Sequence, residues 1–278
     1  MNKIITHEGL TSESDFQSET FNSDRTIYEV IRVIEGIGIF LEDHFLRLKQ
    51  SFGNQSINFE MSFDNFERSV SELININLKI EGNIKFAYSM TEKIAQWAFY
   101  FIPHSYPTDL DFIQGVSTDL LHNERDNPNA KVIQTRIREE ANHLISERNI
   151  YEILLVDRGG MITEGSRSNV FFVKDGVFYT APESMVLVGI TRQKVIECIR
   201  QLGFCLVEEA VSESDIYRFD AVFITGTSPK VLPVRSIRNQ KYNTKLGSVS
   251  DLMNSYNKII EQYIWHEKTS GTGYRIKI

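Results

Sequence analysis

The stretch MITEGSRSNVFFVKDGVFYTAPESMVLVGITRQK, residues 161–194, determines how the rest of the chain is interpreted. It begins with a carboxylate, Glu164, in a turn rich in glycine and serine. Two apolar runs follow, Val170–Val173 and Val177–Thr180, and the Asp-Gly pair between them predicts a β-hairpin. The stretch then enters a helix near Thr191, which we expect to cap it.

The start of this helix is a candidate anion site. Gly189 precedes the first helical residues, so the backbone N–H groups of Ile190 and Thr191 face outward at the positive end of the helix dipole. Such a helix start suits a phosphate group. One segment therefore supplies a carboxylate, a hairpin that holds it and a seat for an anion.

The composition is that of an ordinary globular protein of 278 residues, long enough for one large domain or two small ones. The formal net charge of −7 argues against a general nucleic-acid-binding protein. Cys198 and Cys205 fit neither a disulfide framework nor a metal site. No apolar run reaches the roughly 20 residues of a membrane helix, and residues 1–15 lack the apolar core of a signal peptide. We therefore expect a cytoplasmic protein. We also expect no metal and no nucleic-acid or membrane partner.

The remaining pattern predicts sheets with helices packed against them, after a polar and irregular N-terminus. Strands are expected at residues 26–33, 37–41, 84–90, 96–102, 112–121, 151–156, 205–210, 220–225 and 231–237. Helices are expected at residues 42–52, 62–76, 131–148, 191–202 and 248–263. A polar connector with a proline, residues 121–130, suggests a domain boundary just before it, which gives domains 1–118 and 119–278.

The motifs of the opening stretch resemble those of the class IV aminotransferases, fold-type IV enzymes that depend on pyridoxal 5'-phosphate. That family includes D-amino-acid aminotransferase, branched-chain aminotransferase and aminodeoxychorismate lyase. Three motifs of the family are found in this chain. The Glu-Gly turn is Glu164–Gly165, the asparagine that follows it is Asn169, and the Gly-Ile-Thr-Arg start of a helix is Gly189–Arg192. The resemblance implies an α+β (α/β two-domain) fold, with a small N-terminal two-layer α/β domain and a larger C-terminal α/β barrel-like domain, and a homodimer.

The resemblance also assigns roles to individual residues. Lys131 would hold the cofactor covalently and move a proton, and no other lysine lies between it and Glu164. Taken alone, Lys131 would be read as a solvated lysine. Glu164 would face the pyridine nitrogen of the cofactor and keep it protonated. The other cofactor-binding residues would be Arg47, Ser168, Asn169, Ile190, Thr191 and Thr227.

The substrate side departs from the family pattern. Tyr28 matches an aromatic position that lines the substrate pocket, although it could equally be a strand tyrosine. D-amino-acid aminotransferases hold the substrate carboxylate with an Arg-x-His pair, whereas this chain has Ile102 and His104 there. We therefore expect the carboxylate trap to have moved to another cation. The expected substrate-binding residues are Tyr28, Arg25, Arg167, His104 and Ser228.

The resemblance implies a transaminase that moves an amino group between an amino acid and a 2-oxo acid. Tyr28 and the sequence Thr163–Ser166 with Ser168–Asn169 favour a D-amino acid, and the missing arginine opposes it. The alternatives are a branched-chain L-amino-acid aminotransferase and then an aminodeoxychorismate lyase. From a different class, a protein with the same fold would bind a phosphorylated small molecule without catalysis.

Overall fold

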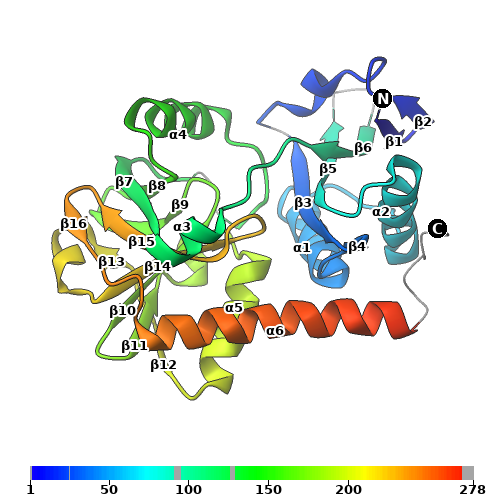
Figure 1. Ribbon diagram of the computed structural model, residues 1–278. Helices are drawn as coiled ribbons and strands as arrows, with labels where there is room; N and C mark the ends of the chain where they lie inside the picture. The colour runs from blue at the N-terminus through cyan, green and yellow to red at the C-terminus, as the bar shows by residue number, and fades with distance from the viewer. Residues whose placement is uncertain (1, 25, 91–94, 126–128, 271–278) are drawn as a thin grey trace. The chain divides into compact units, whose positions relative to one another are not determined.

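The computed structural model describes residues 2–24, 26–90, 95–125 and 129–270. The chain divides into two compact units (Figure 1). The first comprises Met1–Ser105, Ala130–Thr135 and Ile259–Ile278, and the second comprises Tyr106–Asn129 and Arg136–Lys258. This division differs from a boundary between residues 118 and 119, because the strand that begins at Val116 pairs within the sheet of the second unit.

The first unit contains a six-stranded antiparallel sheet in the order β2-β1-β6-β5-β3-β4. Its strands are β1 (Lys3–Thr6), β2 (Gly9–Ser12), β3 (Ile27–Ile34), β4 (Ile37–Gly38), β5 (Gly82–Met90) and β6 (Ala95–Ile102). Its helices are η1 (Ser18–Phe21), α1 (Leu41–Asn54) and α2 (Phe63–Asn77). The alternating apolar pattern of Ile27–Val33 therefore gives the expected strand.

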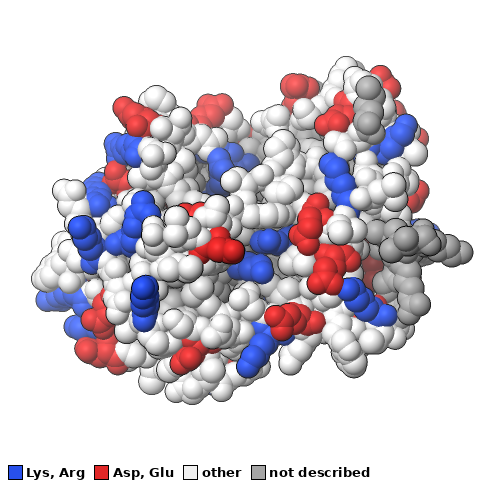
Figure 2. Space-filling model, in the orientation of Figure 1, with Lys and Arg blue, Asp and Glu red and all other residues white. Residues whose placement is uncertain are grey.

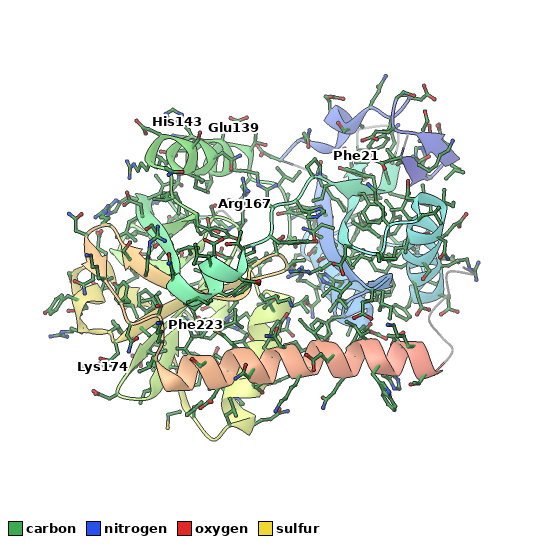
Figure 3. The ribbon with its side chains drawn as sticks, viewed as in Figure 1. Phe21, Glu139, His143, Arg167, Lys174 and Phe223 are labelled. Carbon is green, nitrogen blue, oxygen red and sulfur yellow. The ribbon has the colours of Figure 1, made fainter. Side chains whose placement is uncertain are left out.

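Two apolar cores lie on the two faces of this sheet. On one face, Phe45, Leu48 and Phe52 of α1 pack with residues of α2, β3, β5 and β6, as the helical spacing of these residues predicts. On the other face, Phe21 of η1 packs with Tyr100 of β6 in a smaller cluster, and Figure 3 labels Phe21 there. The N-terminal segment is thus ordered by burial, with a β-hairpin and a 3₁₀ turn, and the expectation of an irregular N-terminus is wrong.

The second unit contains a ten-stranded mixed sheet in the order β12-β11-β10-β14-β15-β7-β8-β9-β13, with β16 paired to β15. Its strands are β7 (Val116–His122), β8 (Glu152–Val156), β9 (Met161–Gly165), β10 (Asn169–Lys174), β11 (Val177–Thr180), β12 (Cys205–Glu208), β13 (Val211–Ser212), β14 (Ala221–Gly226), β15 (Lys230–Ile237) and β16 (Gln240–Lys241). The sheet curls, so that β9 also contacts β10.

The remaining helices are α3 (Asp109–Gln114), α4 (Thr135–Arg148), η2 (Glu183–Met185), α5 (Ile190–Gln201), η3 (Glu213–Arg218) and α6 (Gly247–Ser270), of which α6 contributes to both units. Helix α5 packs on β14, where Phe223, which is labelled in Figure 3, lies; its ring stacks on that of Phe171 of β10. The predicted hairpin is confirmed as β10 and β11, joined by Asp175 and Gly176. Both of these residues have positive φ, 50° and 77°, which is typical of a type I′ turn.

Three expected elements differ from the structure. Residues 112–121 do not form one strand: Thr108 caps the short helix α3 with a capping box, and Gly115, with φ of 70°, ends it before β7. The strand at 37–41 stops at Gly38, because Phe40 has φ of 58° and leads into α1. The helix expected from Lys131 begins at Thr135, since Val132 forms a β-bridge to Ile27.

Within the described residues, every helix is too short or too polar to cross a membrane. No group of three or more metal-ligating side chains gathers in those same residues. Figure 2 shows lysine and arginine side chains interspersed with aspartate and glutamate, without one large basic area on the face that is drawn. This surface agrees with the net charge of −7.

Candidate functional site

Lys131 is fixed by its backbone to the first unit. Its carbonyl oxygen accepts a hydrogen bond from the N–H of Tyr28 at 3.1 Å, and its N–H donates to Ser51 Oγ at 3.2 Å. The next residue, Val132, bridges to Ile27 of β3. The Lys131 amine lies 4.8 Å from the centroid of the Tyr28 ring. The structure therefore brings together two of the predicted site residues, Lys131 and the buried Tyr28.

Arg47 belongs to a buried cluster in the same unit. It donates from Nε and Nη2 to the two carboxylate oxygens of Glu29, at 2.8 Å and 2.6 Å. Nδ1 of His44 lies 2.7 Å from the same carboxylate. Ser51, which accepts from the Lys131 N–H, donates its hydroxyl to the Arg47 carbonyl oxygen at 3.0 Å. Ser51 lies one turn after Arg47 on α1 and thus connects Arg47, the predicted phosphate-binding arginine, to the backbone of Lys131.

The protonation states in this cluster follow from burial and charge. Burial by itself raises the pKa of Glu29, but the charge of Arg47 and the hydrogen bonds from Arg47 and His44 outweigh it and lower the pKa to about 2. Burial lowers the pKa of His44, and the hydrogen bond to Glu29 offsets only part of that effect. Glu29 is therefore anionic and His44 neutral near pH 7, so Nδ1–H of His44 donates to Glu29.

Glu164 lies at the end of β9 in the second unit and is buried. One of its oxygens is 2.8 Å from Nε of Arg125, and the other accepts from the N–H of Leu187 at 3.2 Å. Arg125 also donates to the carbonyl oxygen of Ser166 at 2.8 Å. Opposite charge at this distance favours the ionised carboxylate. The carboxylate predicted from the sequence is therefore held as an anion in a defined orientation.

A second buried carboxylate, Glu152 of β8, organises the turn after Glu164. It accepts hydrogen bonds from the hydroxyls of Ser166 at 2.7 Å and Ser168 at 2.9 Å, and from the N–H of Arg167 at 3.3 Å. The hydroxyl of Ser168 is thus engaged with Glu152. Gly165 is needed at this point, because a Cβ there would come 2.1 Å from Ser168 Oγ.

Asn169 connects this turn to the start of α5. Its side-chain amide donates to the carbonyl oxygen of Leu187 at 2.9 Å and to Glu164 at 3.5 Å. A Cβ on Gly189 would lie 2.3 Å from Asn169 Oδ1, so only glycine fits at the helix start. Gly189 is itself the N-cap of α5 and no side chain caps the helix, which makes the expectation of a Thr191 cap wrong.

The helix start has the features of an anion site. Ile190 and Thr191 are its first residues, both buried. Thr225 lies opposite Asn169 in the β10–β14 ladder, on the same face of the sheet. Its hydroxyl is buried and has no hydrogen-bond partner among the described residues. A buried, unsatisfied hydroxyl beside an uncapped helix start fits a phosphate that would accept from both.

Thr227 and Ser228 follow β14 and are partly buried. Their loop lies close to the Glu164 turn, because a Cβ on Gly226 would be 3.5 Å from the carbonyl oxygen of Arg167. The second unit therefore brings together Glu164, Asn169, the start of α5 and the loop after β14. These elements all come from the stretch that the sequence singled out and from the strand paired with it.

Three further residues were predicted to bind the substrate: Arg25, Arg167 and His104. Arg25 lies outside the described residues. Arg167 is exposed, and its guanidinium donates to Asn142 of α4, the helix that also carries Glu139 and His143 in Figure 3. His104 is exposed beside Gly82, which pairs with Val33 at the far end of β3 from Tyr28.

Sequence reasoning missed four charged residues of these two clusters, Glu29, His44, Arg125 and Glu152. A signal for Glu29 was present, because it alternates with Ile27 and Ile31 on the core face of a strand. A carboxylate in that position needs a buried partner. The same argument applies to Glu152, which opens the apolar run of β8. No pattern in the connector distinguished Arg125.

The chain is similar in sequence to known proteins. A family model described as amino-transferase class IV matches residues 26–237. The D-alanine aminotransferase of Bacillus licheniformis is 29% identical over 245 residues, which cover 81% of this chain and 83% of that protein. A protein of Methanocaldococcus jannaschii, provisionally named a branched-chain-amino-acid aminotransferase, is 27% identical over 260 residues, which cover 87% and 90%.

The fold agrees as well. The crystal structure of a branched-chain amino acid aminotransferase from T.th., with pyridoxamine 5'-phosphate, superposes with a TM-score of 0.84 at 22% identity. The superposition covers 94% of this chain and 95% of the other. The expected fold class is therefore confirmed.

Proposed function

Because the chain belongs to the class IV aminotransferases, we propose that it moves the amino group of a D-amino acid to a 2-oxo acid. The protein is an enzyme that depends on pyridoxal 5'-phosphate and acts on an amino acid and a 2-oxo acid. The choice of a D-amino acid is supported by 29% identity to a D-alanine aminotransferase over most of both chains. A branched-chain L-amino acid is the second candidate, supported by 27% identity to the Methanocaldococcus protein.

The observation that carries the proposed mechanism is the setting of Lys131. Its backbone is tied to Tyr28 and Ser51, while its amine projects over the Tyr28 ring. A lysine so fixed can hold the cofactor covalently and then carry the proton that leaves the Cα of the substrate. Since the backbone bonds do not involve the amine, they position it without using its lone pair.

The remaining residues hold the cofactor. When bound, pyridoxal phosphate supplies an aldehyde carbon for the amino group and a ring that withdraws electrons. Glu164, kept anionic by Arg125, is the residue to pair with the ring nitrogen. The N–H groups of Ile190 and Thr191 and the hydroxyls near the end of β14 suit the phosphate. Arg47 adds a cation whose orientation Glu29 fixes.

The first experiment maps the covalent attachment. Borohydride reduction of the loaded enzyme should fix the cofactor to Lys131, as peptide mass spectrometry would report. Lys131→Ala should lose turnover by several orders of magnitude while still binding cofactor through the phosphate residues. Lys194→Ala, which changes a lysine further along α5, should be labelled and active like the wild type. A label on Lys174 or Lys194 would contradict the role of Lys131.

The second experiment tests substrate handedness. Each enantiomer of alanine, valine, leucine and glutamate is paired with pyruvate or 2-oxoglutarate, and product formation is measured. We expect D-alanine to give the highest kcat/KM. Activity confined to the L-enantiomers of valine and leucine would replace the D-amino-acid assignment by the branched-chain one.

We also propose that the enzyme is a homodimer, which rests on the family resemblance alone. Light scattering should give about twice the chain mass of 32.1 kDa. A monomer mass at micromolar concentration, with full activity, would contradict this proposal.

A further inference from the structure

We propose that Glu152 is a positioning residue for Glu164, an inference that rests on the role proposed above for Glu164 at the ring nitrogen of the cofactor. Glu152 opens strand β8 and is only 4% exposed. Its carboxylate is hydrogen-bonded to the turn of residues 166–168, which joins β9 to β10 and in which Figure 3 labels Arg167. A buried carboxylate is costly unless hydrogen bonds satisfy it.

Four hydrogen bonds satisfy the carboxylate of Glu152. One oxygen accepts from the hydroxyl of Ser166 at 2.7 Å and from the N–H of Ile153 at 2.9 Å. The other oxygen accepts from the hydroxyl of Ser168 at 2.9 Å and from the N–H of Arg167 at 3.3 Å. Each residue of the turn thus donates to Glu152. The carboxylate therefore ties the whole turn to β8, through both of its oxygens.

The same turn places two side chains that contact Glu164. The carbonyl oxygen of Ser166 accepts from Arg125 at 2.8 Å, and Nε of Arg125 lies 2.8 Å from one oxygen of Glu164. Asn169, the first residue after the turn, donates to the other oxygen at 3.5 Å and to the carbonyl oxygen of Leu187 at 2.9 Å. A shift of the turn would therefore move both Arg125 and Asn169. The direction in which the Glu164 carboxylate faces would change with them.

The packing at Gly165 couples Glu152 to Glu164 more directly. A Cβ on Gly165 would lie 3.1 Å from the carboxyl carbon of Glu152 and 2.1 Å from Ser168 Oγ. Glu152 thus packs against the residue that follows Glu164 in the chain. A side chain that replaces Glu152 must keep both its length and its acceptors to hold the turn in place.

Glutamine does not meet this requirement. Each oxygen of Glu152 faces one hydroxyl, which can turn and accept, and one backbone N–H, which can only donate. The amide nitrogen of a glutamine also donates, so in either orientation it meets the N–H of Ile153 or that of Arg167. Glu152→Gln should therefore keep the size of the side chain but loosen the turn. Ser166→Ala should loosen the turn as well, while it leaves the charge of Glu152 in place.

The test measures whether the ring nitrogen of the cofactor is protonated. The enzyme is loaded with pyridoxal phosphate that carries nitrogen-15 at this position, and its nitrogen-15 chemical shift is followed from pH 6 to pH 10. In the wild type, we expect the anionic Glu164 to raise the pH at which half of the nitrogen is protonated. In Glu152→Gln and in Ser166→Ala this midpoint should fall by about one pH unit or more, because a misdirected Glu164 stabilises the proton less.

Asp119→Asn is the matched control. Asp119 lies on the neighbouring strand β7, opposite Ile153, and pairs with Arg148 and Arg238. Its loss should lower the stability of the same sheet without moving the midpoint. An equal fall in this control would show a general loosening of the sheet and would overturn the proposal.

The proposal requires that both turn variants lower the midpoint. A wild-type midpoint in both would show that Glu152 only stabilises the fold. A fall in Glu152→Gln alone would assign the effect to the charge of Glu152 and would overturn its positioning role, as would a fall in Ser166→Ala alone. Should Glu152→Gln not fold, Ser166→Ala decides the question.

Failure of the aminotransferase function is a separate result. It would appear as a wild-type enzyme whose ring nitrogen is protonated, and responds to both turn variants, but which transfers the amino group of no amino acid of either hand. A wild-type ring nitrogen without a proton near pH 7 would contradict the role proposed for Glu164 and would overturn the role of Glu152 with it.

Discussion

Glu29 stands in β3 between Ile27 and Ile31, both fully buried, so its carboxylate is forced into the core. Such a charge is tolerated only when other groups satisfy it. Arg47 and His44 satisfy the carboxylate. The guanidinium of Arg47 is thereby fixed, with the two nitrogens that donate to Glu29 on the same side. An arginine held in this way loses less conformational freedom when it binds phosphate.

Glu29→Gln should therefore weaken both the fold and the cofactor site. Glutamine keeps an acceptor for Arg47 but removes the charge, and we expect the free energy of unfolding in urea to fall by about 2–4 kcal/mol. We expect the Kd for pyridoxal phosphate to rise by roughly 10-fold, because Arg47 is no longer oriented. Glu139→Gln, at an exposed position on α4, is the control and should change neither quantity. An unchanged Kd would mean that Glu29 has no positioning role.

Glu164→Gln tests the other buried carboxylate. The shape of the side chain is retained, but the charge that we assign to pairing with the ring nitrogen is lost. We expect kcat to fall at least 100-fold while the Kd for cofactor changes less than 10-fold, since the charge matters most as electrons move into the ring. Near-normal kcat in this variant would be incompatible with that role. Arg125→Gln should lower kcat less, because the acid itself remains.

At the residue level, the residues that resemble a known motif could be predicted from the sequence, whereas the residues that hold them in place could not. Glu164 and Lys131 could be predicted because they stand in a sequence pattern with fixed spacing. Arg125 and Glu152 were not, since their roles arise only when β8 and the connector are brought against the Glu164 turn. Contacts between residues distant in sequence have no local signature.

At the level of elements, the position of the first turn of α5 is fixed by Arg192. Arg192 is fully buried and donates to the Ala181 carbonyl oxygen at 3.1 Å and to Glu208 at 2.9 Å. These bonds connect the helix to the end of β11 and to β12. The arginine of the Gly-Ile-Thr-Arg motif is therefore structural in this chain: it fixes the helix start, and the residues before it form the proposed anion site.

Gly189→Ala tests that placement. The new Cβ would lie 2.3 Å from Asn169 Oδ1, so either the helix start or the Asn169 amide must move. We expect a loss of about 1–3 kcal/mol in the free energy of unfolding and weaker cofactor binding. Gly53→Ala is the control, because a Cβ there meets nothing within 4 Å and alanine favours helix α1. That variant should be slightly more stable, by about 0.5–1 kcal/mol. Equal cofactor affinity in both variants would contradict the proposed anion site.

Elements with regular apolar periods were predicted well, and those set by local backbone geometry were not. The β10–β11 hairpin and helices α1, α2 and α5 follow directly from spacing and turn residues. Helix α3 was missed because its capping box begins a helix of only one to two turns inside an apolar run. The start of α4 was placed too early, because the β-bridge of Val132 overrides the helical propensity of its segment.

At the level of the whole molecule, the chain does not divide at a single point. Ala130–Thr135 returns to the first unit and carries Lys131 with it, between two segments of the second unit. A shift in composition indicates a linker, but it does not show that a short segment returns to the first unit. A single boundary at 118–119 therefore placed Lys131 in the second domain. Unfolding of the first unit should accordingly remove Lys131 from its partners Tyr28 and Ser51.

The buried cluster of this unit should make the stability of the whole protein sensitive to acid. The pKa of His44 lies below its usual 6.5 and that of Glu29 falls from 4.5 to about 2 in the folded state. As the pH drops, the unfolded chain binds protons at these positions before the folded chain does, which favours unfolding. Stability should thus decline below about pH 6.5 through His44, and further between 4.5 and about 2 through Glu29. The second effect amounts to about 3 kcal/mol.

Urea unfolding of the cofactor-loaded wild type and of two variants across pH 4–8 measures this dependence. His44→Gln, whose amide can still donate to Glu29, should lose the decline just below pH 6.5 and keep the steeper one at lower pH. His143→Gln, at an exposed histidine on α4, is the matched control and should follow the wild type (Figure 3). A wild-type stability that rises as the pH falls from 8 to 6.5 would show that His44 is protonated in the folded state, because only a folded-state pKa above the usual 6.5 gives that sign. The Glu29 carboxylate would then be paired with two cations, and the neutral histidine assigned to this cluster would be wrong.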